Sequence, residues 1–214
     1  MTVPTPTSIF RFIHVDNLRA ILERGGIWAP NFEPKNGHDY KKIHNTDVQD
    51  KRRVRRIPCG PDGVIHDYVS FYFGPRSPML YRLHTDWVQD YDEGQESLIY
   101  LVSTTQAVAE SNALFVFSDG HGIATFTAWF SDLAALDKVD WNTVYAKMWK
   151  DTNDDMDRQR RKQAEFLVHK FCPWSLICKI AVVNDRMKTK VEDVLEDFPE
   201  DLKRLVTVKP DWYY

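Results

Sequence analysis

The sequence has few cysteines and no long apolar run. Its 214 residues include three cysteines, Cys59, Cys172 and Cys178, without a CxxC pair or paired Cys/His spacing. This odd set indicates neither a disulfide framework nor a zinc site, and it favours a reducing compartment. No run of about 18 apolar residues could span a membrane, and the N-terminal MTVPTPTSIF lacks the basic and apolar parts of a signal peptide. We therefore expect a cytoplasmic protein that has no membrane partner.

Several widespread active-site motifs are missing as well. The sequence contains no P-loop, GxGxxG, HExxH or GxSxG. Each of these motifs is the local signature of one chemistry, so the commonest nucleotide-binding, metalloprotease and hydrolase classes lose their sequence support. Internal repeats, low-complexity segments and Gly/Ser linkers are absent too. We expect a single domain over residues 1–214, since domains commonly hold about 150 residues.

The composition is typical of a globular protein with a core of its own. Apolar residues make up 43% and aromatic residues 13% of the chain, which is enough to bury a substantial core. The net charge of −3 argues against a protein that coats nucleic acid indiscriminately. Basic residues nevertheless cluster at Lys51–Arg56 and Arg158–Lys162. Such patches suit a polyanionic ligand held at one site, although either cluster alone fits a solvated helix face better.

Short strands and helices alternate along the chain. Strands are expected at 9–13, 68–73, 97–102, 114–117, 164–168, 177–183 and 205–208, where β-branched and aromatic residues gather. Helices are expected at 16–24, 51–56, 104–111, 126–136, 141–149 and 191–198. The polar segment 30–46 and the segment 76–81 are expected to be loops. Many short strands with scattered helices predict an α+β fold.

Glu165 is the first candidate for chemistry. It is a lone acid that enters the apolar segment 164–168 directly after a basic cluster. If it is buried, it needs a partner, because an unpaired interior carboxylate is unfavourable. A carboxylate here could hydrogen-bond a sugar hydroxyl and stabilise an oxocarbenium ion as a glycosidic bond breaks. The pattern alone favours the alternative, an exposed glutamate at the start of a strand.

Two arginines and an aromatic segment are further candidates. Arg52 lies in the KRRVRR run and could hold a pyrophosphate or face a DNA backbone, with a solvated helix face as the alternative. Arg11 interrupts the apolar FRFI, where an inward side chain needs an anion or a carbonyl, and an outward one is about equally plausible. The segment 71–81 combines aromatic rings with Arg76, as stacking on bases or nicotinamide requires, although such stripes are more often core.

Five ordered motifs resemble one family. They are HDYVSFYFGPRSPMLY at His66–Tyr81, GQE at Gly94–Glu96, VFSDGHG at Val116–Gly122, KQAEFLVHKFCPW at Lys162–Trp174 and DWYY at Asp211–Tyr214. Together they resemble DarT over nearly the whole chain. The resemblance implies an α+β fold with the split, mixed β-sheet core of ADP-ribosyltransferases, surrounded by helices. It also implies a toxin that uses NAD as its substrate without a metal and modifies thymidine or guanosine in single-stranded DNA. Its implied partner is a DarG-type antitoxin with a macrodomain.

The resemblance further assigns residues to catalysis and to NAD. Glu165 takes the position of the catalytic glutamate and Arg52 that of the catalytic arginine, which we interpret as a positioning and electrostatic group because guanidinium stays protonated. The NAD-contacting strand, commonly His-Ile-Thr in the family, is Arg11, Phe12 and Ile13 here. This departure resembles the transferase branch that supports the nicotinamide ribose with arginine, and it makes guanosine an open choice beside thymidine.

Other positions that the resemblance assigns lie around the same cleft. For NAD they are Ala20, Trp28 and the covering loop Asn31–Asp50. For DNA they are His121, on the loop that sets target specificity, and Arg76, Ser77, Pro78, Met79, Leu80, Tyr81, Lys147, Met148, Trp149, Lys150, Gln159, Arg160, Arg161, Lys162 and Gln163. Lysine and arginine would make DNA affinity salt-dependent, and stacking would hold an unpaired strand. We expect a monomer.

Two other functions remain open at this stage. One is a catalytically silent module that binds single-stranded nucleic acid through the basic and aromatic surface. The other is a transferase that acts on protein or tRNA. Labelled NAD offered together with oligonucleotides, RNA and protein separates these functions from DNA modification.

Overall fold

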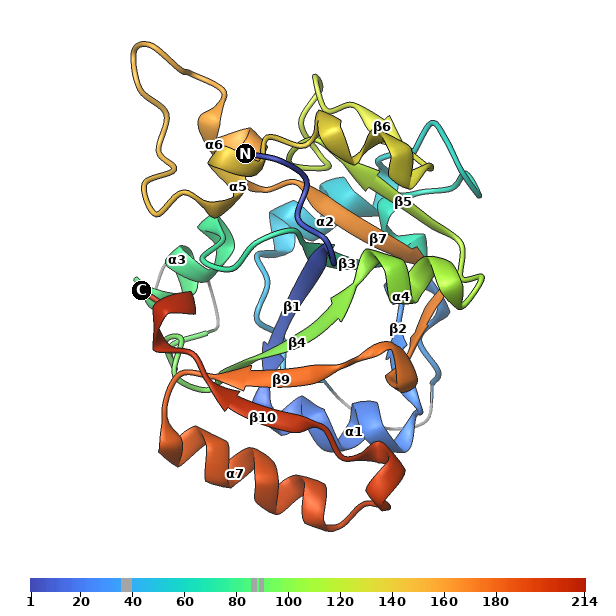
Figure 1. Cartoon of the computed structure of the whole chain (residues 1–214), viewed down its shortest axis with the longest axis vertical. Helices are drawn as coiled ribbons and strands as arrows, with labels where there is room; N and C mark the ends of the chain where they lie inside the picture. The colour runs from blue at the N-terminus through green and yellow to red at the C-terminus, as the bar shows by residue number, and fades with distance from the viewer. Residues whose placement is uncertain (36–39, 86–87, 89–90) are drawn as a thin grey trace.

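The core of the protein is one large mixed sheet. The computed structural model describes residues 1–35, 40–85, 88 and 91–214. Its main sheet has the strand order β10-β9-β4-β1-β3-β7-β5-β6, and a second sheet pairs β2 with β8 (Figure 1). Neighbouring strands are antiparallel except β9 and β10. The strands are β1 Ser8–His14, β2 Gly26–Trp28, β3 Tyr68–Tyr72, β4 Leu98–Thr104, β5 Phe115–Ser118, β6 Trp129–Phe130, β7 Glu165–His169, β8 Phe171–Pro173, β9 Lys179–Val182 and β10 Leu205–Val208.

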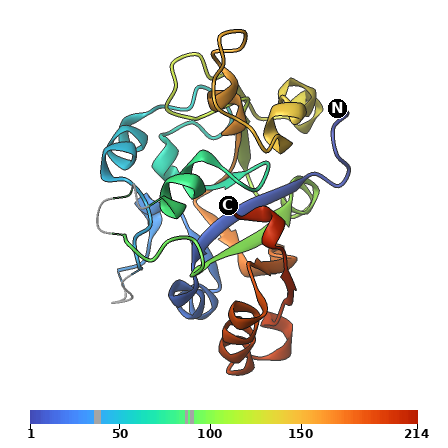
Figure 2. The same cartoon turned by 90° about the vertical axis from the view of Figure 1, so that its left-hand side faces the viewer.

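Both ends of this sheet carry helices. The long α7 lies at the end that holds β9 and β10, whereas α5 and α6 lie at the opposite end in both views (Figures 1 and 2). Within the described part of the chain, no helix is both long and apolar enough to cross a membrane. The α-helices are α1 Leu18–Glu23, α2 Thr46–Val54, α3 Pro78–His84, α4 Thr105–Glu110, α5 Trp141–Tyr145, α6 Arg158–Lys162 and α7 Asp185–Glu196.

The sheet is split between β1 and β3. Strand β1 pairs with β4 over its whole length, and β3 pairs with β7 in the same way. Between β1 and β3, however, the register has a single pair, Phe10 with Tyr72. Beyond it the strands diverge, and the side chain of Arg11 reaches across, where its Nη1 donates to the carbonyl of Ser70 over 2.8 Å. This gap confirms the expected split, mixed sheet and opens space for a ligand in its middle.

Alternation along β1 fixes which side chains face this space. Successive strand residues point to opposite faces of a sheet. Ile9 and Ile13 accordingly belong to the larger apolar core, and Phe10 and Phe12 to a second core cluster on the other face. Arg11 alternates with Phe10 and Phe12, so its side chain points to the same face of the sheet as Ile9 and Ile13.

Of the helices expected from the sequence, one is wrong and one is shorter than predicted. Residues 126–136 do not form one α-helix: Trp129–Phe130 is the edge strand β6, paired with β5, and Leu133–Lys138 is a 3-10 helix. The apolar spacing indicated a helix with a buried face, but Phe126 is 88% exposed and does not belong to such a face. The helix expected at 141–149 ends at Tyr145, where the chain turns.

The expected loop 76–81 is wrong as well. Pro78–His84 forms helix α3, in which Pro78 occupies the first turn and the Ser77 hydroxyl accepts from the backbone N–H of Leu80. Proline is favoured in a first turn, where its missing N–H has no helical partner anyway, and serine is a preferred cap. The two residues that suggested a loop are therefore the start signal of a helix.

Candidate active site

Glu165 and Arg52 form a buried ion pair. Glu165 begins β7, is 2% exposed, and pairs with an arginine that lies 113 residues earlier, on α2. Arg52 Nη1 donates to Oε1 over 3.0 Å and Nη2 to Oε2 over 2.7 Å. Two parallel bonds of this kind are the strongest arrangement between guanidinium and carboxylate. The structure thus decides between the two interpretations of Glu165, which is interior and partnered.

The pair is held in its charged form. Burial by itself raises the pKa of Glu165, but the charge and hydrogen bonds of Arg52 outweigh it, and the pKa lies below the usual value. The pKa of Arg52 lies above its ordinary value because the attraction of Glu165 outweighs burial. Arg52 Nη2 also donates to the hydroxyl of Ser70 over 2.6 Å. Arg52 therefore remains a cation, which supports its interpretation as a positioning and electrostatic group.

A tight loop brackets the carboxylate from the other side. The backbone N–H of Gly122 donates to Glu165 Oε1 over 3.0 Å, and the N–H of Glu165 itself donates to the Ser118 hydroxyl over 3.2 Å. That hydroxyl donates to the carbonyl of Gly120 over 2.7 Å. The VFSDGHG motif thus contributes backbone and side-chain groups that fix the direction of the carboxylate.

Gly122 leaves almost no room for a side chain. A Cβ there would lie 3.0 Å from Ile65 Cδ1 and 3.3 Å from Glu165 Oε1. We expect Gly122→Ala to displace the loop and lower kcat about tenfold, because small shifts of a catalytic group are costly. Steady-state rates and the melting temperature, measured together, check this. An unchanged kcat in a folded variant would show that the Gly122 contact is dispensable.

A cavity of about 720 Å³ opens beside the pair. Its walls include Arg11, Phe12, Ile13 and Trp28, together with Arg52 and Glu165. Residues 40–45 and much of α2 also line it, so this part of the expected covering loop does face the cleft, while residues 36–39 of that loop lie outside the described residues. Ala20, on α1, does not line the cavity.

Arg11 lies in this cavity with an incomplete set of partners. Its Nη1 has the Ser70 carbonyl, but its buried Nε has no hydrogen-bond partner among the described residues. Burial, and then the charge of Arg52, lower the pKa of Arg11. Arg11 thus lies near a second guanidinium group and, among the described residues, pairs with no carboxylate, so an anionic or carbonyl group of a ligand would complete its contacts.

The expected DNA segments contribute only some of their residues to the cavity. His121, Pro78, Met79, Gln159 and Gln163 line it. Ser77 and Leu80 are 1% and 0% exposed, respectively, so they hold α3 in place and cannot contact a strand of DNA. The stacking surface expected at 76–81 is therefore reduced to the outward side chains of α3.

The basic cluster of α6 serves the fold. Arg160 pairs with Asp119 over 2.8 Å and with Asp157 over 2.7 Å, and Arg161 pairs with Asp140 and Asp155. Lys162 is 4% exposed, and its Nζ donates to the carbonyls of Val144 and Ala146 over 2.6 and 3.0 Å. The position of Lys162 corrects its sequence assignment, because a buried ammonium cannot reach a phosphate. Arg160 and Arg161 already have carboxylate partners, which weakens the prediction that they contact DNA.

The buried ammonium of Lys162 should make stability depend on pH. Burial lowers its pKa to about 8 from the usual 10.5. Between these values the unfolded chain binds more protons than the folded one, so the free energy of unfolding rises with pH. Relative to that of Lys162→Met, the free energy of unfolding of the wild type should rise by at most about 2 kcal/mol from about pH 8 to about pH 9.5. Urea unfolding across this range checks it, and a constant difference would contradict it.

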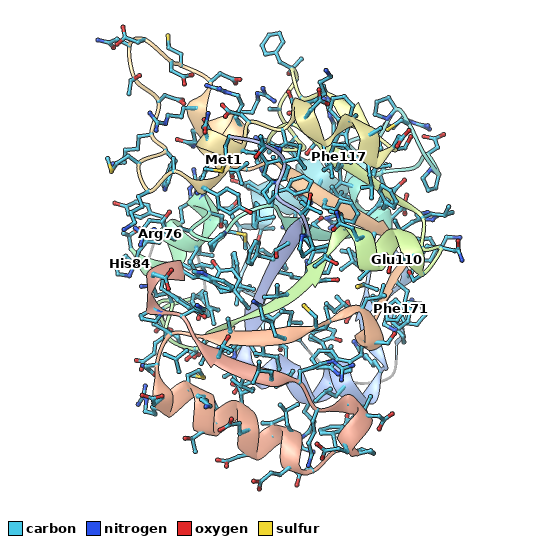
Figure 3. All side chains as sticks on the ribbon, in the orientation of Figure 1. Met1, Arg76, His84, Glu110, Phe117 and Phe171 are labelled. Atoms are coloured by element: carbon cyan, nitrogen blue, oxygen red, sulfur yellow. The ribbon has the colours of Figure 1, made fainter. Side chains whose placement is uncertain are left out.

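The two remaining DNA segments meet at the C-terminus. Arg76 lies over the Tyr214 ring, 4.3 Å from its centroid, and Tyr81 contacts the same ring edge-on at 5.1 Å. Trp149, 7% exposed, donates from Nε1 to the Tyr214 hydroxyl over 2.6 Å. Figure 3 shows Arg76 on this side of the molecule, away from Glu110. Lys147, Met148 and Lys150 are exposed on the same segment.

Several site residues escaped the sequence argument. Ser70, which contacts both Arg11 and Arg52, and Tyr214 belong to quoted motifs, so only the motif match could have indicated them. Gly122 also belongs to a quoted motif, and only the motif match could have indicated it. His44 and His66 line the cavity, and burial, followed by nearby cations, lowers the pKa of both. No local pattern distinguishes such histidines from surface ones.

Known proteins share this architecture throughout. A curated DNA ADP-ribosyl transferase of Thermus sp. strain 2.9 is 40% identical, and the match covers 100% of this chain and 99% of that protein. A solved structure of DarT from Thermus sp. 2.9 in complex with ADP-ribosylated ssDNA aligns with a TM-score of 0.93 over 100% and 99% of the two chains. Another, in complex with NAD+, aligns with a TM-score of 0.88 at 39% identity, over 100% of each chain.

A split sheet with this carboxylate at its opening is therefore that of an ADP-ribosyltransferase. The family model described as ssDNA thymidine ADP-ribosyltransferase, DarT, matches residues 10–214. The chain belongs to the DarT family, which confirms the family that the five motifs indicated.

Proposed function

We propose that this protein transfers ADP-ribose from NAD+ to a base in single-stranded DNA, with Glu165 as the catalytic carboxylate. The observation that carries the proposal is the buried, ionised carboxylate at the wall of a dinucleotide-sized cavity. Arg52 and the Gly122 N–H fix its oxygens from two sides. Such preorganisation is what stabilisation of a developing positive charge requires.

The cavity suits NAD+ in size and chemistry. About 720 Å³ lies within the range of cofactor pockets, roughly 300–1,000 Å³. The strand residues Arg11, Phe12 and Ile13 and the segment 40–45 both line the cavity. The free Nε of Arg11 offers a donor to the nicotinamide ribose or its neighbouring phosphate. Apolar and aromatic side chains around these donors supply contact area for the rings.

The chemistry begins at the nicotinamide ribose. Glu165 hydrogen-bonds a ribose hydroxyl while the bond from the anomeric carbon to nicotinamide breaks, and its negative charge stabilises the oxocarbenium ion. Arg52 keeps the carboxylate ionised and oriented. Nicotinamide leaves with the electrons of the broken bond, and a base nitrogen then attacks the same carbon. Holding both reactants in one cleft supplies much of the rate.

The acceptor base enters beside His121. This side chain lines the cavity, and burial lowers its pKa even though Glu165 raises it, so the imidazole is neutral near pH 7. A neutral imidazole can accept the proton that the attacking base nitrogen loses. Met79, Gln159 and Gln163 line the same cavity and offer contacts to the base. If this chain follows the description of the family model, the base is thymidine. The alternative is guanosine.

Labelled NAD+ offered to single-stranded oligonucleotides, RNA and protein tests the proposal. We expect label on DNA that is lost in Glu165→Ala, and mass spectrometry of the product names the base. Label on protein or tRNA alone would support the rival transferase. DNA binding without label would support a silent binding module.

A DarG-type antitoxin with a macrodomain is the proposed partner. An enzyme that removes ADP-ribose from DNA would reverse the proposed modification. Growth arrest on expression, relieved when such an antitoxin is co-expressed, would support this partner. Arrest that persists beside an active macrodomain would contradict it.

A further inference from the structure

Helix α3 turns one fixed face to the cavity. Pro78, Met79 and Arg82 line the cavity, and Arg82 lies four residues after Pro78 and three after Met79, which places it beside each of them on the helix. Leu80 and Leu83 are both 0% exposed in the core cluster beneath. Because these leucines anchor α3, the position of its cavity face is set by the fold.

Arg82 differs in its contacts from four other arginines of this region. Arg52, Arg160 and Arg161 have carboxylate partners, and Arg76 donates to the carbonyl of Tyr213 and lies over a tyrosine ring. Among the residues that the structure describes, none forms a hydrogen bond or ion pair with the side chain of Arg82, which is exposed. A guanidinium group with all its donors available thus stands at the cavity wall.

Arg82 also lies on the acceptor side of the cavity. The charge of Arg82 reaches His121, where it adds to burial and to Arg52 in lowering the pKa of the imidazole, against the effect of Glu165. Gln159 and Gln163 line the same cavity. A base that enters beside His121 carries its own phosphodiester, and this group stays outside at the rim. A guanidinium is the side chain best suited to bind it, through two parallel hydrogen bonds.

We infer that Arg82 binds the phosphate of the target nucleotide and thereby positions the acceptor base. The inference rests on the proposed function, which needs a base in the cavity, but it names a contact of its own. Phosphate contacts fix the position of a nucleic acid without reading its sequence. Arg82 is a positioning residue by this argument, and Glu165 remains the catalytic one.

Oligonucleotide kinetics at saturating NAD+ test the inference. We expect Arg82→Gln to raise the KM for the oligonucleotide roughly tenfold, the loss of one charge-assisted bond, and to leave kcat and the KM for NAD+ within about twofold. The slope of log affinity against log salt should fall by about 0.7, the value for one phosphate of a single strand. Arg82→Lys keeps the charge and should keep the slope.

A neutral phosphate analogue locates the contact. A methylphosphonate beside the target base should weaken the wild type about as much as Arg82→Gln does, and should weaken that variant no further, as expected for two changes that remove one interaction. The matched control is Arg186→Gln, on the 77% exposed Arg186 side chain of α7, which should bind like the wild type. A full methylphosphonate effect in Arg82→Gln, or an unchanged KM, would overturn the inference.

Direct binding keeps this test independent of the proposed function. Fluorescence anisotropy with the same oligonucleotides measures affinity whether or not ADP-ribose is transferred. If the wild type binds but does not label DNA, the proposed function fails, and a tenfold loss in Arg82→Gln still supports the contact. If the wild type labels DNA and Arg82→Gln binds equally well, only the contact fails.

Discussion

Glu165→Gln should lower kcat for transfer to DNA about 10³-fold. The substitution keeps the shape of the side chain but removes the negative charge that faces the developing cation, and removal of one such electrostatic group costs about 10²–10³-fold in other enzymes. The KM for NAD+ should change far less, because most of the cavity wall is intact. Single-turnover transfer to a labelled oligonucleotide is the measurement. Glu110→Gln, at the exposed end of α4, is the control.

Stability must be measured alongside, because Glu165 is half of a buried pair. Loss of one partner of such a pair destabilises a protein by about 3–5 kcal/mol, since the other charge is left uncompensated. The pKa of Glu165 is lowered, so its contribution is present above the usual carboxylate pKa and is lost as the pH falls below it. Assays well below the melting temperature separate the two effects. A folded Glu165→Gln protein with a rate within tenfold of the wild type would refute the catalytic role.

Arg52→Lys should lower kcat about 10²-fold while conserving the charge. An ammonium group cannot reproduce two parallel bonds to Glu165 together with the bond to the Ser70 hydroxyl. The carboxylate would stay ionised but lose its fixed direction, and small errors in the position of a catalytic group lower rates by about two orders of magnitude. Transfer rates measured over a pH series distinguish lost orientation from a changed pKa.

The matched control for Arg52→Lys is Arg56→Lys. Arg56 lies four residues later, is exposed, and does not line the cavity. The same chemical change there should leave both rate and stability near the wild type. If Arg52→Lys retained full activity, the guanidinium geometry would have no part in catalysis, and charge alone would suffice.

Local pattern was reliable where an element depends on its own residues. The strand expected at 205–208 is β10, and the helix expected at 104–111 is α4 with Thr104 as its cap. Val191–Phe198 captured only the second half of α7, because the first half is polar and begins at the cap Asn184. The pattern was wrong at 126–136, where pairing with β5 decided the structure.

The sequence by itself determined the α+β class and the family, because several long motifs occur in order and alternation marks most strands. The motif match also pointed to Glu165 and Arg52. Only the tertiary structure decided that these two form one buried pair, because they lie 113 residues apart in the chain. It likewise decided that Lys162 is buried and that no described residue pairs with the side chain of Arg82. The chemistry of a charged side chain depends on the groups that folding places beside it, and the neighbouring residues in the sequence do not specify those groups.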